Sequence, residues 1–338
     1  MFLYLTQNGY TVSKSWWRFV VSSPRWDSDN TEQQIPISLV EGIIIFGQIQ
    51  ITTSVIKSCL KWKIPVFFLS KYGNYFGKLD SLEYRNVEFL YHHIHASLDD
   101  DISLQYAKTF IKAKVRNSRV MLMKWSRYYK TDVWDSHLND LQYYLNKIDQ
   151  CESKEVLRWY EWTCAKIYFE KFSLFVSHPF VFTTRNRRPP RDPINSLLSL
   201  WYTLLAQTIT MILDIYGFNT QIGFFHQPKD LRSLLVLDIM EMYRSWIVDD
   251  LVIRMTHTQK MDICHFFIDK DNEKRPVLLT DDWLKLFIEE YYKTMFRSKE
   301  SFSPWVEFIK LKMIEKNLEL FKSSLVNQTR NYEGFTIK

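Results

Sequence analysis

The hydrophobic and polar positions of this chain follow two different patterns in its two parts. Up to about residue 85, short strand-like runs such as Phe2–Thr6 lie between turn residues, and alternation of residues follows through Val12 to Val21. Gly42–Phe46 is a continuous apolar run typical of a buried strand. Beyond residue 97, apolar residues recur at helical spacing. The pattern predicts a two-domain α+β protein, with a β-rich N-terminal domain that contains one helix and an all-α C-terminal domain.

Turn and capping signals refine this prediction. Asn8-Gly9 between two strand-like runs is typical of a two-residue hairpin turn, because both residues tolerate positive φ. Thr52 or Thr53 can cap the N-terminal helix. The apolar face of that helix includes Val55, Ile56, Cys59 and Leu60.

We predict an N-terminal domain over 1–85, a linker over 86–96 and the α-helical domain over 97–338. The linker contains His92, His93 and His95. On an extended segment adjacent side chains point to opposite sides, so we interpret these histidines as incidental, not as a metal site.

Charge and composition favour a folded protein with a polyanionic partner. The net charge is +6 and the sequence pI is about 8.9, which attracts nucleic acids and anionic membrane surfaces alike. Pro193–Leu213 carries no formal charge, but its Ser, Thr and Gln residues favour a buried central helix over a membrane span, so no membrane partner is expected. We expect a cytoplasmic location, since the first residues lack the pattern of a secretory signal.

Three acidic residues and one histidine are the candidate chemistry. Asp238 and Glu241 are three residues apart on a predicted helix, so their side chains share a face within reach of one ion, and apolar neighbours leave little polar surface around them. Glu161 and His226 complete the set. Carboxylates with one imidazole suit Mg²⁺ or Mn²⁺, although each residue alone has an ordinary structural interpretation.

A basic turn precedes the helix that Asp192-Pro193 is expected to start. It contains Arg185, Arg187, Arg188 and Arg191. Such a cluster can grip phosphates with help from the helix dipole, and it is equally consistent with a solvated surface turn.

The order of these pieces resembles a known family over nearly the whole chain. The segments that carry the resemblance are 35–53, 64–70, 187–199, 223–226 and 237–244. They are similar to the CRISPR-associated integrase that captures spacers, the first of the CRISPR-associated proteins.

This resemblance implies a site and a reaction. Its metal ligands would be Glu161, His226 and Glu241, and Asp238 would be an auxiliary catalytic acid close to the ion. The DNA-binding residues would be Lys166, Arg185, Arg187, Arg188, Arg191 and Arg244. Lys166 stands where the family usually has arginine, and Trp162 where it has glycine. The implied reaction is the transesterification in which the 3′-hydroxyl of a captured DNA fragment attacks the end of a CRISPR repeat.

The resemblance also implies partners. It predicts homodimers formed through the N-terminal β-domains, with two dimers bridged by the small CRISPR-associated partner subunit and bound to double-stranded DNA, both spacer precursor and repeat. Two alternatives remain. The first alternative to an integrase is a structure-selective, metal-dependent nuclease that acts on branched DNA. The second is a non-catalytic DNA-binding scaffold whose acidic residues are structural.

Overall fold

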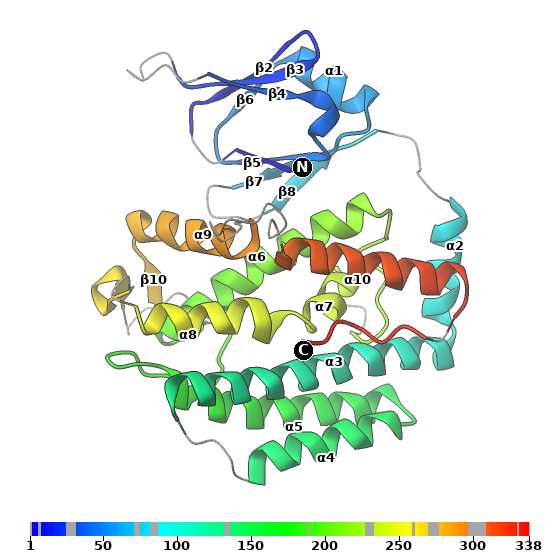
Figure 1. The fold of residues 1–338 in the computed structure, drawn as a ribbon, viewed down its shortest axis with the longest axis vertical. Coiled ribbons are helices and arrows are strands. Elements are labelled where there is room, and N and C mark those ends of the chain that lie inside the picture. The colour runs from blue at the N-terminus through cyan, green and yellow to red at the C-terminus, as the bar shows by residue number, and fades with distance from the viewer. Residues whose placement is uncertain are drawn as a thin grey trace. The chain divides into compact units, whose positions relative to one another are not determined.

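The chain forms two compact units in the computed structural model, Met1–Arg85 and Asn86–Lys338 (Figure 1). The structure describes residues 2–5, 8–24, 32–70, 75–81, 87–131, 136–187, 189–226, 233–258, 261–269, 277–296, 309–329 and 331–337. Strands dominate the first unit and helices the second, which confirms the predicted α+β fold class.

Two four-stranded sheets and one α-helix make up the described part of the N-terminal unit. The first sheet has the order β1 (Phe2–Leu5), β5 (Gly42–Phe46), β7 (Val66–Leu69) and β8 (Tyr75–Leu79). The second has the order β4 (Glu32–Pro36), β3 (Arg18–Ser22), β2 (Thr11–Ser15) and β6 (Gln50–Ile51). The helix is α1 (Thr53–Lys61), with Thr52 at its N-cap.

Side chains from both sheets and from α1 share one hydrophobic core. Phe19, Ile43, Val55 and Val66 are fully buried in it. The continuous apolar run at β5 is buried along its whole length, as the sequence predicted, because β5 is paired on both edges with β1 and β7.

The predicted hairpin at Asn8-Gly9 is wrong. β1 pairs with β5 in parallel, whereas β2 pairs with β3 in the other sheet, so this turn carries the chain between sheets. Gly9 does adopt the expected positive φ of 84°. A turn dipeptide fixes only local backbone geometry, and the buried apolar β5 offers β1 a more favourable partner.

The C-terminal unit is built from helices around α3 (Asp100–Tyr129), which packs against α2, α4 and α5. The other helices are α2 (Val87–Leu98), α4 (Ser136–Asp149), α5 (Lys154–Phe172), α6 (Pro193–Ile215), α7 (Leu234–Met240), α8 (Asp250–Thr256), α9 (Asp281–Phe296) and α10 (Ile309–Val326). Short 3₁₀ turns lie at Ser173–Phe175 and Ile263–His265 in this unit, and at Ile37–Leu39 in the N-terminal unit. A two-stranded sheet of β9 (Phe266–Ile268) and β10 (Val277–Leu279) shows that the unit is not all-α as predicted.

Where the sequence suggested a linker over 86–96, the structure has helix α2. Phe89, His93 and Ala96 recur at helical spacing and are buried against the rest of the unit. His93 Nε2 lies 3.1 Å from the carbonyl oxygen of Ile222, and burial lowers the pKa of His93 to about 4. The interpretation as a linker was therefore wrong, and His93 is a neutral packing residue.

α6 is the central helix predicted at this position. Asp192 caps it by accepting a hydrogen bond from the backbone N–H of Asn195 at 2.8 Å, and Pro193 occupies the first helical position. In the described part of the chain it is the one helix long and apolar enough to cross a membrane, and 61% of its apolar window is buried inside the protein. Its fully buried Trp201 and Leu205 are typical of a core helix.

Candidate functional site

Glu161 and Glu241 converge on a buried lysine. Glu161 lies in α5 and Glu241 directly follows α7, and both form ion pairs with the ammonium group of Lys114 in the middle of α3. The distance from Lys114 Nζ to Glu241 Oε2 is 2.7 Å. Two of the three predicted metal ligands thus come together from separate elements of the fold.

These charges lie largely out of contact with water. The side chains of Lys114, Glu241 and Arg244 are 13%, 5% and 12% exposed, and Arg244 Nη2 lies 3.0 Å from Glu241 Oε1. Burial alone would raise the pKa of Glu241, but Arg244, Lys114 and His226 outweigh it and lower that pKa to about 2. Burial likewise opposes charge on Lys114, yet Glu161 and Glu241 raise its pKa.

Asp238 organises the segment that ends at His226. Its Oδ2 accepts hydrogen bonds from the backbone N–H groups of Phe224 at 2.6 Å and Phe225 at 3.0 Å. Its Oδ1 accepts from the backbone N–H of His226 at 3.0 Å and from the ring Nδ1 at 2.6 Å. Because Asp238 is fully buried and engages four donors, it is a positioning residue for His226 in this structure. Its predicted role as an acid beside an ion stays a prediction.

Gly223 allows this segment to approach α7. A Cβ atom added there would lie 2.7 Å from Leu234 Cβ and 2.8 Å from Asp238 Oδ2. The glycine therefore lets Asp238 reach the backbone amides. Since Asp238 holds Nδ1 of His226, the other ring nitrogen, Nε2, is the one left for a ligand.

The donor chemistry of Glu161, Glu241 and His226 suits a hard divalent cation. Within the described part of the chain, Glu241 Oε2 is buried and accepts no hydrogen bond of normal geometry. Among the same residues, no three carboxylate, imidazole or thiol groups lie close enough together to hold a metal ion. The three side chains therefore have the right chemistry for a divalent cation, but in this structure the Lys114 ammonium lies between the two carboxylates. The ligand assignment stays a prediction.

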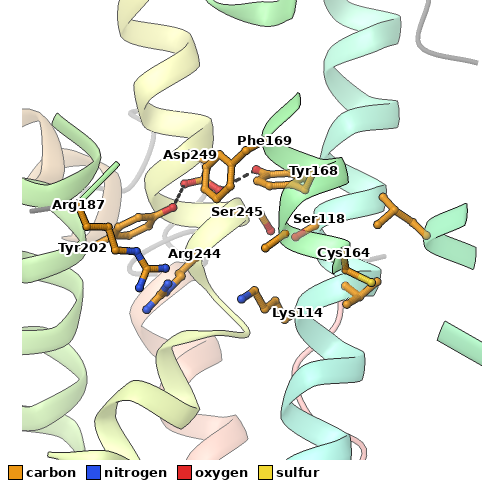
Figure 2. Close-up of a pocket in the computed structure, with 13 residues that line it drawn as sticks. Lys114, Ser118, Cys164, Tyr168, Phe169, Arg187, Tyr202, Arg244, Ser245 and Asp249 are labelled. Atoms are coloured by element: carbon orange, nitrogen blue, oxygen red, sulfur yellow. Dashed lines mark hydrogen bonds between the residues drawn. The ribbon is translucent and has the colours of Figure 1, made fainter. Parts of the chain in front are cut away.

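A small cavity with a volume of about 30 Å³ lies beside these ion pairs (Figure 2). Within it, Tyr168 and Tyr202 donate hydrogen bonds to Asp249 at 2.7 and 2.5 Å. Burial raises the pKa of Asp249 to about 6, against the opposing effect of the two tyrosine hydroxyls. The Arg244 guanidinium lies 4.9 Å from the centre of the Tyr202 ring. The network thus links the partner of Glu241 to α5 and α6.

Arg244 and Asp249 are the two ends of a π-helical segment, η3 (Arg244–Asp249), which leads directly into α8. In a π-helix residues five apart are hydrogen-bonded neighbours on one face. Both side chains therefore line the same cavity (Figure 2). π-Helical turns occur frequently at functional sites.

The described arginines of the basic turn before α6 divide into one that is half-buried and two that are exposed. Arg185 Nη1 donates to Asn195 Oδ1 at 2.7 Å, and its guanidinium lies 5.5 Å from the centre of the Tyr202 ring, so Arg185 holds the turn against α6. Arg187 and Arg191 are exposed and available to a phosphate backbone. Arg188 lies outside the described residues.

Lys166 and Trp162 both lie at the surface of α5. The Lys166 ammonium is 5.9 Å from the centre of the Trp162 ring, and Trp162 is 61% exposed. Neither side chain pairs with Glu161, whose partner is Lys114.

An open groove with a volume of about 590 Å³ lies beside His226. Lys154 and Arg158 line it, and both belong to the N-terminal part of α5. Neither was predicted as a functional residue. The signal was present in the sequence, because 154, 158 and 161 are spaced so that both cations share a helix face with Glu161.

Lys114 was also missed, for a related reason. It lies one helical turn from the fully buried residues Phe110 and Asn117 on α3. A lysine at core spacing needs an internal anion, and that need was a signal that a carboxylate lay opposite.

Comparison of the sequence with known proteins identifies the family of this chain. A sequence model described as "CRISPR associated protein Cas1" matches residues 3–293. The CRISPR-associated endonuclease Cas1 3 of Thermus thermophilus is 32% identical over 252 residues, which are 75% of this chain and 73% of that protein. The chain belongs to the Cas1 family.

Solved structures share the fold expected of a Cas1 protein. A partial Cas6-RT-Cas1–Cas2 complex matches with a TM-score of 0.78 and 22% identity, covering 100% of this chain and 99% of that one. A casposase bound to an integration product matches with a TM-score of 0.76 and 22% identity, covering 100% and 94%. At this identity the likeness shows the fold, and the resemblance to the Cas1 family predicted from the sequence is confirmed.

Proposed function

We propose that this Cas1-family protein inserts captured DNA fragments into a CRISPR array as new spacers by transesterification. The 3′-hydroxyl oxygen of the fragment forms a bond to a backbone phosphorus, the bond from that phosphorus to its original 3′-oxygen breaks, and the leaving oxygen takes up a proton in place of the one the attacking hydroxyl gives up. The bonds formed and broken are alike, so no energy-rich cofactor is required. The observation that supports this proposal is the convergence of Glu161 and Glu241 on one buried cation position in a Cas1 fold.

We propose that Glu161, Glu241 and His226 hold Mg²⁺ or Mn²⁺. A bound ion of this kind supplies positive charge that polarises a phosphodiester and stabilises the negative charge of the transition state. The protein's own residues prepare the site. Asp238 keeps the proton of His226 on Nδ1, and Arg244 fixes one oxygen of Glu241 at 3.0 Å.

The groove beside His226 is the proposed path for DNA. Lys154 and Arg158 line it, and the exposed Arg187 and Arg191 extend the positive charge of the same unit. Such side chains position a phosphate backbone without reading its sequence. We also propose that Lys166 and Arg244 contact DNA. Arg244 is at the same time paired with Glu241.

Insertion into both strands requires two active sites at a fixed distance. We therefore propose a homodimer formed through the N-terminal units, acting in the cytoplasm on spacer-precursor DNA and a double-stranded repeat. We also propose that a small partner subunit bridges two dimers. One solved structure with this fold is a partial Cas6-RT-Cas1–Cas2 complex, which supports this assembly.

Strand transfer tests the proposal directly. Labelled duplex with free 3′-hydroxyl ends is incubated with a repeat-bearing plasmid, Mn²⁺ and the small partner subunit. Wild type should give joined product, and Glu161→Gln and Glu241→Gln should give none. Glu170→Gln is the matched control, since its side chain also lies on α5 and is 57% exposed. Loss of product by the control, or its retention by both site variants, would contradict the proposal.

A second function, metal-dependent DNA cleavage, is favoured by the name endonuclease that relatives carry. Water would then replace the 3′-hydroxyl as the attacking oxygen at the same site. Cleaved plasmid without joined product would favour this nuclease. Tight DNA binding that both glutamine variants retain, with neither product from wild type, would favour the non-catalytic scaffold.

A further inference from the structure

The position of Lys114 between two carboxylates indicates how the proposed metal site is prepared, an inference that rests on the proposed function. The lysine projects from α3, whereas its two carboxylate partners come from α5 and from the turn after α7. It therefore joins three elements that no local hydrogen-bond pattern would hold in register. A buried ammonium in this position is stable only because it faces two anions.

The charges around Glu241 are already balanced. Lys114 and Arg244 neutralise Glu161 and Glu241, with Arg244 on Oε1 and Lys114 on Oε2 of Glu241. The Lys114 ammonium lies between Glu161 Oε1 and Glu241 Oε2. A divalent cation that bound these two oxygens would have to take its place, because two positive charges at the same position repel each other strongly. Metal binding and the Lys114 ion pairs are thus mutually exclusive.

Space for a displaced ammonium lies next to the ion pairs. The cavity shown in Figure 2 is lined by Lys114 itself and by the hydroxyl groups of Ser118 and Ser245. Ser118 lies one turn further along α3, and a lysine side chain has enough rotatable bonds to turn toward it.

We propose that Lys114 is a positioning residue that occupies the cation position between Glu161 and Glu241 in the metal-free protein and gives it up to a divalent ion by turning into the adjacent cavity. In this role it keeps two buried carboxylates from repelling each other before the ion arrives. It also makes the site less avid for metal than the carboxylates alone would be.

Removal of the lysine charge should therefore have two opposite effects. Lys114→Met removes the cation that Glu161 and Glu241 share and leaves Arg244 as the remaining partner of Glu241, which lowers the thermal unfolding midpoint of the metal-free protein. The same change removes the competing cation, so Mn²⁺ should bind at least about tenfold more tightly, and added Mn²⁺ should restore more stability to the variant than to wild type.

Electron paramagnetic resonance of free Mn²⁺ at pH 8 measures this affinity on the full chain, and thermal unfolding with and without saturating Mn²⁺ measures the stability. Lys114→Gln provides a second, polar replacement. Lys112→Met is the matched control, since Lys112 lies on the same helix and its exposed side chain pairs with Asp149. Unchanged or weaker Mn²⁺ affinity in the Lys114 variants, or an equal loss of stability with and without Mn²⁺, would overturn the proposal.

A crystal structure of wild type grown with Mn²⁺ gives a readout that needs no variant. The anomalous signal should lie between Glu161 and Glu241, with Lys114 Nζ beyond ion-pair distance from both. Lys114 still between the carboxylates, with Mn²⁺ elsewhere, would refute the displacement. These binding results are independent of strand transfer, so an inactive protein that shows them would contradict the proposed function alone.

Discussion

Replacing Asp238 with asparagine tests the link between a buried carboxylate and the orientation of His226. The carboxylate accepts four hydrogen bonds, three from backbone N–H groups and one from the His226 ring. Asparagine keeps one accepting oxygen and turns the other position into a donor, so two of the four donors face an N–H group. A buried donor left without an acceptor costs about 1–3 kcal/mol. Asp238→Asn should therefore lower the free energy of unfolding by roughly 2–6 kcal/mol.

The same substitution should affect activity beyond stability. If the new amide N–H₂ faces the His226 ring, Nδ1 must accept and the ring proton moves to Nε2, which removes the lone pair expected to bind an ion. Urea unfolding followed by tryptophan fluorescence gives the stability, and strand transfer at a temperature where circular dichroism shows a folded variant gives the activity. Asp149→Asn, whose side chain is 57% exposed, is the control and should change stability by less than about 1 kcal/mol. An Asp238→Asn protein that unfolds at the wild-type urea concentration would refute the reasoning.

Two further predictions concern the surroundings of the site. Gly223→Ala should destabilise the protein by about 1–3 kcal/mol, because its Cβ would lie 3.0 Å from the Leu234 backbone. Gly77→Ala is the control, since a Cβ there would meet nothing within 4 Å. Equal urea midpoints for the two variants would contradict this prediction. Asp249 has its pKa raised from 3.8 to about 6, so the folded protein binds this proton more tightly, and the stability from it is present below pH 3.8 and lost as the pH rises through 6. Relative to Asp249→Asn, wild type should lose up to about 3 kcal/mol between pH 4 and pH 7, and parallel pH profiles of the two proteins would argue against it.

The sequence predicted those parts of the site that depend on local spacing. Asp192-Pro193 starts a helix because capping and proline geometry act within one turn. Asp238 and Glu241 were selected as a pair from their helical spacing and apolar surroundings, and the family resemblance joined Glu161 to Glu241. The structure brings Glu161 and Glu241 to one lysine. A buried carboxylate requires a counter-charge wherever the chain folds, so this requirement is visible without coordinates.

Other features depend on tertiary partners that no local pattern contains. Lys114 looks like an ordinary helix lysine until α5 and the turn after α7 pack against it. Asp238 was predicted to lie near an ion with Glu241 because both lie on one helix face. Only the fold shows that the backbone amides following Gly223 donate hydrogen bonds to its oxygens. The histidine segment was misjudged for the same reason, since the burial of His93 comes from helices distant in sequence.

The π-helical segment has a consequence for the length of the chain itself. An α-helix has about 3.6 residues per turn, so a π-turn carries in effect one inserted residue. Deleting one residue between Arg244 and Asp249 should restore an α-helical register and rotate Arg244 relative to Asp249 by roughly 100°. Such a deletion removes no group that touches Glu241, yet it would separate the arginine beside Glu241 from the tyrosine-bound aspartate. The number of residues between Arg244 and Asp249 therefore matters as much for this site as which residues they are.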